Sequence, residues 1–588
     1  MFRALSPADL QAVEAQLQLR TVQRGEALVQ EGEEAAELFV VVSGRFRVWR
    51  SGQPAHIAEI GRGQPIGEIA FLRGGPRTAT VRAARDSVVV ALTREDFEDV
   101  TRRSPGIWPA LTATLAGRLA ETTRATSWQP RLARPKTIAV CPAGAKSVPE
   151  IFQRNLVRMF VDATRSQFVY SAWLREVSSG ASDAELTTLL NKLEQAHDYV
   201  VYIADPELTA WTEKALRQAD LILWVGDASA GGSDLNSIEQ FASQAQAPGE
   251  EWLVLVHPRP GAAAGTLRWL SPRPRLGLHH HVAADNLPDY SRLLRFIEGK
   301  ALGLVACGGG AFSAAHIGTY QALQEAGLQF DIMGGTSGGA AMTAAFALGA
   351  PADDISHLIE DIFIAKKAMG RWTWPRYSLL DHAVLDAELA RHYTDVNIED
   401  LWTPFFAVST NVTRAAPHYH RTGKLWKAIR ASGSIPALLP PVYTDDGEIL
   451  VDGCLLDNVP VEAMRRLKSG PNVVLELEIP TLLRYDLKYE DIPARRDLLW
   501  KLVTPFRGSE LPSAPSPQAV LVRSLMVNRQ EVAEQMTAED LLLMLPVPER
   551  YKHLDWREHR RLREMGYDFA RTQLEAWRAK GHPLFASG

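Results

Sequence analysis

The sequence has few of the features that mark secreted, metal-binding and nucleic-acid-binding proteins. Its three cysteines, Cys141, Cys307 and Cys454, lie far apart and lack metal-ligand spacing, so they indicate buried thiols in a reducing compartment rather than a disulfide framework. The net charge of -5 over 588 residues gives no reason to expect a nucleic acid as a partner. The N-terminal segment lacks the apolar centre of a signal peptide.

Long hydrophobic runs are also missing. The two least charged stretches, 301–324 and 332–352, are interrupted by Gly, Ser, Thr, His or Pro. They are therefore more typical of buried strand-turn-helix units than of membrane-spanning helices. We expect a cytoplasmic protein, with peripheral contact to the inner face of a membrane left open. The sequence does not indicate an oligomeric state.

The order of apolar runs, turns and helix-like stretches predicts a multidomain α/β protein of four parts. Residues 1–130 show period-two runs punctuated by Gly and Pro and then helical spacing, which indicates an antiparallel β-roll closed by helices. Residues 135–300 and 301–480 alternate compact apolar runs with helix-like stretches, the pattern of a parallel sheet flanked by helices. Residues 481–588 are expected to form a helical extension packed on the third part.

One serine stands out in the third part. Ser337 lies in the stretch FDIMGGTSGGAAMTAAFALGA, residues 330–350, which reads as a strand end, a tight glycine turn and a small-residue helix. Residues 335–339 fit G-x-S-x-G, the pattern of a nucleophile elbow, in which a sharp turn holds a serine hydroxyl above the sheet. A glycine-rich connection that lets a helix pack close to a sheet has the same letters, so the motif alone does not decide between the two.

Two further stretches supply what a catalytic serine needs. A serine hydroxyl requires a nearby base, and the developing oxyanion requires preorganised donors such as backbone N–H groups. Gly308, Gly309 and Gly310 follow a predicted strand and precede a helix start, where glycines let the backbone turn its N–H groups inward. Asp452 follows another apolar strand and precedes Gly453.

With these residues the chain resembles a patatin-like phospholipase, and more closely a bacterial relative of neuropathy target esterase. The flanking stretches agree over nearly the whole chain, including HIG after the glycine loop and DNVPVEA after the aspartate. The resemblance implies a Ser–Asp dyad of Ser337 and Asp452, with oxyanion donors from Gly308, Gly309 and Gly310. It also implies hydrolysis of a phospholipid or lysophospholipid through an acyl-enzyme, with no metal or other cofactor in catalysis.

The glycine loop departs from the family pattern at two positions. The family's loop reads G-G-G-x-R-G or close to it, whereas this chain has Phe312 and Ser313 at the Arg and Gly positions. The missing cation leaves a second interpretation open, a catalytically weak or inactive patatin-like protein with a regulatory or scaffold role.

A Ser-His-acid triad is the chemical alternative to the dyad, and it requires a histidine after the acid. The histidines that follow Asp452 stand in a charged tail, and two others precede it in the loop APHYHRTGK; these are His553, His559, His582, His418 and His420. His316, on the helix after the glycine loop, is expected to be packed or hydrogen-bonded. The three histidines at 279–281 have no carboxylate at ligand spacing and predict no metal site.

The stretch PIGEIAFLRGGPRTATVRA, residues 65–83, carries a second set of candidate binding residues. Glu68 can accept a ribose hydroxyl, Arg77 offers a planar cation to a phosphodiester, and the N–H groups of Gly67 and Thr78 add donors. This stretch resembles the phosphate-binding cassette of cyclic-nucleotide-binding domains, which implies cAMP or cGMP as a regulatory ligand. A transcription factor would need a basic recognition helix after the roll, and a linker followed by a strand-rich domain stands there instead.

The roles of two further stretches, one in the second part and one in the third, are not decided by their residues. The segment 137–147, TIAVCPAGAKS, is similar to a strand running into a phosphate loop, but it lacks the first glycine and has Ala145 before Lys146, so no Walker site is expected. The part around it resembles the segment that joins sensor and catalytic domain in the neuropathy target esterase group, and a Rossmann-like coupling or packing module is expected. The stretch 362–381, IFIAKKAMGRWTWPRYSLLD, fits an acyl site, a membrane-facing lid or a cover of the core.

Overall fold

The computed structural model describes residues 18–52, 57–103, 108, 134–177, 180, 182–230, 234–244, 250–261, 263–393, 396–478, 487–494, 514–515, 520, 532–548 and 552–585. The chain forms two compact units, residues 1–299 and 300–588. The helices expected after residue 104 and most of the segment 481–531 lie outside the described residues.

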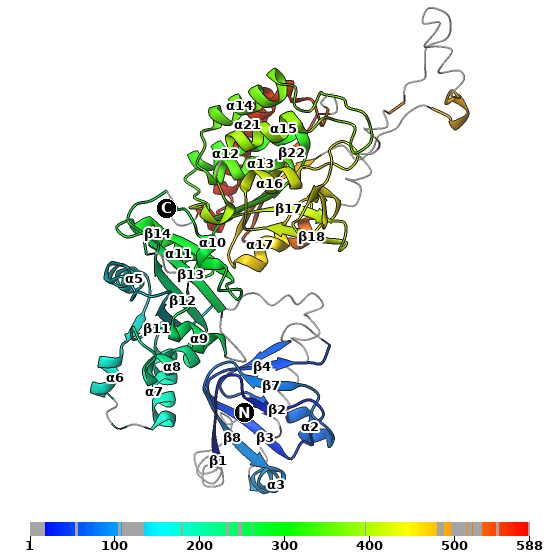
Figure 1. The fold of residues 1–588 in the computed structure, drawn as a ribbon. Helices are drawn as coiled ribbons and strands as arrows, with labels where there is room; N and C mark the ends of the chain where they lie inside the picture. The colour runs from blue at the N-terminus through cyan, green and yellow to red at the C-terminus, as the bar shows by residue number, and fades with distance from the viewer. Residues whose placement is uncertain are drawn as a thin grey trace, which may run out of the picture. The chain divides into compact units, whose positions relative to one another are not determined.

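The first unit begins with a β-roll of two four-stranded sheets, in which every strand pair is antiparallel (Figure 1). Phe39 and Val41 on one strand and Val89 and Ala91 on its neighbour share one core. They alternate with other side chains because successive residues of a strand point to opposite faces. The predicted β-roll is confirmed. In sheet order its strands are β1 (Gln18–Val22), β8 (Ser87–Thr93), β3 (Glu37–Ser43), β6 (Pro65–Ile66), and β2 (Ala27–Val29), β7 (Thr80–Ala83), β4 (Phe46–Trp49), β5 (Ala58–Ile60), with α2 (Glu68–Arg73) and α3 (Arg94–Arg103) attached.

The rest of the first unit is a six-stranded parallel sheet whose strands are connected by helices. Strand β9 is buried along its whole length, as expected for a central strand covered on both faces. Its two neighbours in the sheet are β11 and β12. In the dinucleotide-binding order the second strand of the domain, β10, would lie beside β9 in place of β11. The predicted parallel α/β class is confirmed, with this difference in strand order. In sheet order the strands are β10 (Ser166–Val169), β11 (Tyr199–Ile203), β9 (Thr137–Pro142), β12 (Leu221–Asp227), β13 (Glu250–His257) and β14 (Leu278–Ala283), and the helices are α5 (Glu150–Ala163), α6 (Ser171–Val177), α7 (Asp183–Ala196), α8 (Ala210–Gln218), α9 (Ser237–Ser243), α10 (Leu267–Leu270) and α11 (Leu287–Ile297).

Within the first unit a buried ion-pair cluster joins the β-roll to helices α7 and α8. Lys214 of α8 donates to Asp86 at 2.7 Å and to the hydroxyl of Thr187 at 2.6 Å, and Arg217 donates to the same carboxylate at 3.0 Å. Both Lys214 and Asp86 are buried. Although burial alone would raise the pKa of Asp86, the two cations hold it below its ordinary value. Removing one partner of such a pair leaves a buried charge unpaired and costs about 3–5 kcal/mol.

The second unit contains a mixed eight-stranded sheet, and this sheet positions the candidate site. Its central strands β17, β16, β15, β21 and β22 are parallel, and β18, β19 and β20 pair antiparallel at one side. The carboxyl ends of parallel strands meet at one edge, where connecting loops build sites. In sheet order the strands are β19 (Val442–Tyr443), β20 (Ile449–Asp452), β17 (Phe405–Asn411), β16 (Ile332–Thr336), β15 (Gly303–Ala306), β21 (Asn472–Glu478) and β22 (Leu541–Pro546), with β18 (Ala416–His420) on β17.

The C-terminal helix α21 (His559–Ala579) lies beside α12 (Ala315–Glu325) in the second unit (Figure 1). The close approach requires glycine on both helices, because a side chain at Gly318 would collide with the backbone of Arg563 and one at Gly566 with that of Ala315. None of the helices in the described part of the chain combines the length and apolar character that a bilayer crossing requires. The other helices are α13 (Gly338–Ala347), α14 (Ala352–Ile359), a π-helical turn (Glu360–Ala365), α15 (Ala383–His392), α16 (Leu425–Ser432), α17 (Val461–Leu467), α20 (Val532–Gln535) and the 3₁₀ turns Gly310–Ala314, Ile398–Asp400, Gly453–Leu455, Tyr489–Asp491, Trp556–Glu558 and Pro583–Phe585.

Candidate active site

Ser337 occupies a strained turn between the end of β16 and the start of α13. Its backbone has φ 53° and ψ −124°, a region that costs a non-glycine residue about 1–3 kcal/mol. The turn is so tight that a Cβ at Gly335 would lie 2.7 Å from the carbonyl carbon of Gly339. A side chain at Gly339 would collide with the backbone of Cys307. The glycines around Ser337 are therefore required by the turn, which has the geometry of a nucleophile elbow.

The hydroxyl of Ser337 donates a hydrogen bond to Asp452 Oδ2 at 2.7 Å. Asp452 ends strand β20 and is buried, and its other carboxylate oxygen accepts from the amide of Cys454 at 2.9 Å. Burial raises the pKa of Asp452, while the hydrogen bonds from Cys454 and Ser337 oppose that shift. A raised pKa makes the ionised carboxylate a stronger base toward the serine proton.

Ser432, at the end of α16, holds the elbow from the other side. Its hydroxyl accepts from the amide of Ser337 at 2.7 Å and donates to the carbonyl of Val408 at 2.5 Å. The amide of Ser337 is therefore engaged within the protein and is not a free donor for a substrate oxygen.

The glycine loop lies against the elbow, and its three amides differ in what they contact. A Cβ at Gly308 would lie 2.9 Å from Ser337 Cβ, and the amide of Gly308 donates to Asn458 Oδ1 at 3.1 Å. Among the hydrogen bonds of the described residues, none engages the amides of Gly309, Gly310 or Gly338. Gly310 and Gly338 also line the cavity beside Ser337. The geometry therefore favours Gly309, Gly310 and Gly338 over Gly308 as donors to an oxyanion.

The two unusual residues of the loop are buried. The ring of Phe312 packs on that of His553 with centroids 4.5 Å apart, and the carbonyl of His553 accepts from the amide of Ala311 at 2.7 Å. The hydroxyl of Ser313 rests against Gly338, at a position where a Gly338 side chain would collide with it. In the described part of the chain this hydroxyl has no hydrogen-bond partner.

No histidine of the described residues hydrogen-bonds to Ser337 or Asp452. His316 Nε2 lies 3.1 Å from the carbonyl oxygen of Cys307. Burial lowers the pKa of His316 to about 4. His420 lies 2.8 Å from Ser409 Oγ, and burial lowers its pKa to about 3. Both imidazoles are therefore neutral at physiological pH and are engaged away from the serine.

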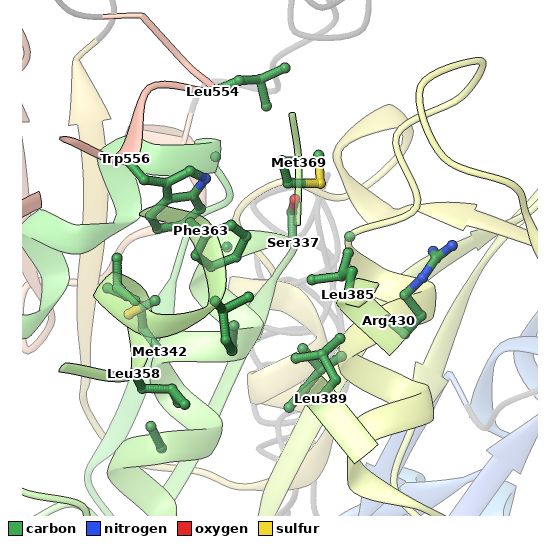
Figure 2. Close-up of a pocket in the computed structure, with 18 of the residues that line it drawn as sticks. Ser337, Met342, Leu358, Phe363, Met369, Leu385, Leu389, Arg430, Leu554 and Trp556 are labelled. Carbon is green, nitrogen blue, oxygen red and sulfur yellow. The ribbon is translucent and has the colours of Figure 1, made fainter. Parts of the chain in front are cut away.

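An apolar cavity of about 110 Å³ opens beside Ser337 (Figure 2). Its one charged lining residue, Arg430, is engaged by Asp386 at 2.6 Å and by Ser434 at 2.5 Å. The residues 362, 363 and 369 line the cavity, so the first half of the stretch 362–381 contributes to it, whereas residues 370–377 are exposed and cover no core. The remaining apolar lining is Ala341, Met342, Ala345, Ile355, Leu358, Ile359, Leu385, Leu389, Tyr393, Ile429, Ile435, Leu439, Leu554 and Trp556.

The candidate cyclic-nucleotide residues gather at the start of α2. Gly67 has φ 78°, and a side chain there would collide with the guanidinium of Arg77. Arg77 donates to the carbonyls of Gly67 at 3.0 Å and Glu37 at 2.6 Å. Burial lowers the pKa of Arg77, and nearby carboxylates oppose that shift. Glu68 is buried and Thr78 is exposed beside Arg77, so the four predicted residues lie in one small region of the roll.

Comparisons with known proteins identify three domains in the chain. Family models match residues 19–104 as a cyclic nucleotide-binding domain, residues 134–306 as a Neuropathy Target Esterase family P-loop like domain, and residues 304–465 as a patatin-like phospholipase. The chain contains a patatin-like phospholipase domain and is similar to proteins of the neuropathy target esterase group. The resemblance predicted from the sequence is confirmed.

Curated relatives of this group extend well beyond the matched region. Neuropathy target esterase sws of Drosophila melanogaster is 29% identical over 623 residues, which covers 95% of this chain and 43% of that protein. Human patatin-like phospholipase domain-containing protein 6 is 28% identical over 614 residues, with 95% and 44% covered. The chain thus spans less than half the length of these relatives. A solved catabolite activator protein of Thermus thermophilus is 32% identical, with 21% of this chain and 59% of that chain covered and a TM-score of 0.20.

The loop after β9 in the P-loop like domain contacts the protein's own carboxylates. The amide of Gly144 donates to Glu239 Oε2 at 3.0 Å, and Lys146 pairs with Asp227 at 3.1 Å. In a phosphate loop these groups would face a ligand. Here both groups contact carboxylates of the domain itself, and the absence of a Walker site stays a prediction.

A cluster of two carboxylates and one histidine lies elsewhere in the patatin-like unit, and both carboxylates are already paired with cationic side chains. In the described part of the chain, Asp361, Glu388 and His392 are close enough together to hold a metal ion. Lys366 and Arg391 already pair with both carboxylates at 2.7–2.8 Å. Two cations beside two carboxylates disfavour a divalent ion there.

Three residues of the candidate site are not among those predicted from the sequence: Asn458, Ser432 and Gly338. Asn458 lies in the stretch DNVPVEA, Ser432 ends α16, and Gly338 belongs to the G-x-S-x-G motif. The oxyanion role of the residue after a nucleophile is a general feature of elbows and points to Gly338. The contacts of Asn458 and Ser432 depend on chain segments far apart in sequence, and no local signal predicts them.

Proposed function

We propose that the patatin-like unit is a serine hydrolase of lipid esters, with Ser337 as nucleophile and Asp452 as general base. The observation that carries this proposal is the 2.7 Å hydrogen bond from the Ser337 hydroxyl to a buried carboxylate, beside an apolar cavity. A buried carboxylate with a raised pKa is suited to take a proton from a serine.

In the first step Asp452 accepts the hydroxyl proton of Ser337 while Oγ bonds to the ester carbonyl carbon. The carbonyl oxygen becomes an oxyanion, which the amides of Gly310 and Gly338 on the cavity wall and of the adjacent Gly309 stabilise. Each such donor is worth about 3 kcal/mol in the transition state. When the tetrahedral intermediate collapses, the ester C–O bond breaks and Asp452 returns the proton to the leaving alcohol.

In the second step Asp452 accepts a proton from water, whose oxygen attacks the acyl-enzyme carbonyl. The same amides stabilise the second oxyanion. Collapse breaks the bond to Ser337 Oγ, which recovers the proton from Asp452, and releases the carboxylic acid. One ester and one water are thus converted into one acid and one alcohol.

The apolar lining of the cavity supports an acyl group as the part of the substrate that lies beside Ser337. Its walls are apolar except for Arg430, whose guanidinium is engaged by protein groups. Burying acyl carbons there gains about 0.8 kcal/mol per CH₂ group. Together with the names of the relatives, this favours a phospholipid or lysophospholipid over a soluble short ester as the natural substrate.

We further propose that cAMP or cGMP binds the β-roll and changes the hydrolase activity. The support is the cyclic nucleotide-binding family match and the clustering of Gly67, Glu68 and Arg77. The phosphate would replace the backbone carbonyls that Arg77 now contacts, and a ligand shifts an equilibrium only if it binds two states unequally.

The hydrolase proposal is tested with purified wild type and Ser337→Ala on a short-chain p-nitrophenyl ester and on lysophosphatidylcholine. We expect turnover of both by the wild type and of neither by the variant. Turnover that survives the substitution contradicts the assignment of the nucleophile. Absence of wild-type turnover on a broad lipid panel would instead favour a regulatory or scaffold protein, the alternative that Phe312 in place of an arginine motivates.

A further inference from the structure

A projecting hairpin of the patatin-like unit exposes three aromatic side chains. Its two arms are joined where Thr373 N donates to the carbonyl of Leu379 at 3.1 Å and Asp381 N donates to that of Arg371 at 2.8 Å. Every residue from 370 to 377 is exposed. The exposed fractions of the aromatic residues are 64% for Trp372, 85% for Trp374 and 75% for Tyr377.

Such a cluster is unusual on a protein surface in water. Large aromatic side chains usually bury most of their area, and contiguous exposed ones mark a binding surface. Trp and Tyr in particular favour the boundary between water and lipid, because one end of each ring system is apolar and the other forms hydrogen bonds.

The charge of the hairpin indicates which surface it fits. Arg371, Arg376 and the adjacent Lys367 are cationic, and Asp381 is the one carboxylate between residues 367 and 381. The guanidinium of Arg376 lies 5.4 Å from the ring centroid of Tyr377, so charge and aromatic surface are presented together. Cations beside interfacial aromatics favour an anionic phospholipid surface.

The hairpin is continuous with the cavity beside Ser337. It begins directly after Met369, which lines that cavity. Its return arm is fixed to the unit by two backbone bonds, from Leu379 N to the carbonyl of Ala437 at 2.8 Å and from Leu380 N to that of Leu438 at 3.0 Å. A membrane that binds the hairpin therefore has its lipids close to the opening of the cavity.

We propose that residues 370–377 dock the patatin-like unit onto an anionic phospholipid bilayer. Trp372, Trp374 and Tyr377 enter the interface and the arginines meet lipid phosphates. The relevance of this docking rests on the proposed hydrolase function, but the docking itself requires no turnover and can be measured without it.

The test uses the full chain with the Ser337→Ala substitution, so that no lipid is consumed. Co-sedimentation is measured with phosphatidylcholine vesicles, with and without phosphatidylglycerol. Trp374→Ser and Arg371→Gln/Arg376→Gln are compared with Tyr489→Ser, a control whose ring is 86% exposed and lies outside the hairpin. We expect vesicle partitioning to fall about tenfold or more in both hairpin variants and to stay unchanged in the control. When the same three variants are made in the chain that keeps Ser337, their hydrolysis of a soluble p-nitrophenyl ester should equal that of the wild type.

Several results would overturn the docking proposal. These are equal partitioning of the hairpin variants and the control, no binding of the parent to anionic vesicles, or a loss of soluble-ester hydrolysis in Trp374→Ser without a loss of vesicle binding. The last result would make the hairpin a part of the active site. If no ester is hydrolysed at all while the vesicle results hold, the proposed function fails and the docking surface stands.

Discussion

The substitution Asp452→Asn tests the dyad most directly because it keeps the shape of the side chain and removes its ability to accept a proton. One side-chain oxygen accepts from Cys454 N at 2.9 Å and the other accepts from Ser337 Oγ at 2.7 Å. In the asparagine variant the amide oxygen is expected to keep the Cys454 contact, which turns the NH₂ group toward Ser337. The serine hydroxyl then faces a donor and has no base.

The expected loss in kcat is about 10³–10⁴-fold, the size found when a base that orients and deprotonates a serine system is made neutral. At 1.36 kcal/mol per factor of ten this corresponds to roughly 4–5.5 kcal/mol of transition-state stabilisation. The assay is initial-rate hydrolysis of a p-nitrophenyl ester and a lysophospholipid. The double variant Ser337→Ala/Asp452→Asn should be no slower than the slower single variant, because groups that act as a unit are not additive.

Stability should respond in the opposite direction. Burial raises the pKa of Asp452, so folding favours its protonated form, and this contribution to stability is present below the unfolded pKa and lost as the pH rises through the folded pKa. At neutral pH the ionised carboxylate therefore destabilises the fold, and Asp452→Asn removes that cost. We expect the unfolding midpoint of the variant to match or exceed that of the wild type near pH 7, with the difference shrinking toward pH 4.

The pH dependence of the wild type supplies the internal check. Because the base must be ionised, kcat/KM should rise with pH through the raised pKa of Asp452, above the ordinary value of 3.8. Turnover by Asp452→Asn within a factor of a few of the wild type, with the acid limb intact, would refute the reasoning for the base.

Three other substitutions test the surroundings of the dyad and the sensor. Ser432→Ala removes the acceptor of the Ser337 amide and should lower kcat by about 10²-fold through misplacement of the elbow, with KM little changed; an unchanged kcat would mean that the glycines alone hold the turn. Ser313→Ala removes a buried hydroxyl without a partner in the described residues and should stabilise the unit by about 1 kcal/mol in thermal unfolding, whereas a destabilisation would indicate an ordered water there. Arg77→Gln should weaken cAMP or cGMP binding in calorimetry by roughly 10- to 100-fold, and equal binding by variant and wild type would exclude Arg77 as the phosphate contact.

The sequence predicts the classes of the domains because periodicity reports which faces of strands and helices are buried. The uniformly apolar β9 is one example, because a strand that is covered on both faces buries every side chain. Periodicity does not say which strands are neighbours, so the placement of β11 beside β9 required the structure. Strand order depends on how the crossover helices pack, and no local pattern encodes that.

The candidate site shows the same division. The sequence singles out Ser337 and Asp452, and the structure has their side chains 2.7 Å apart, while their catalytic roles stay predictions. It does not reveal that Asn458 engages the amide of Gly308, because the two residues are 150 positions apart and an asparagine has many possible partners. Such distant contacts, rather than the glycines themselves, decide which backbone amides of the loop can donate to an oxyanion.

The C-terminal segment explains how the glycine loop is held without the family's arginine. The family model ends at residue 465, yet the carbonyl of His553 accepts from the amide of Ala311 and its ring packs on Phe312. A side chain at Gly310 would collide with the same carbonyl, so the loop and residues 552–556 fit each other closely. Trp556 from this segment also lines the cavity and stacks on Phe363, with ring centroids 4.0 Å apart. A buried arginine at position 312 would need a counter-charge, whereas Phe312 is held by apolar packing. Residues far beyond the matched domain are therefore a structural part of the candidate oxyanion site.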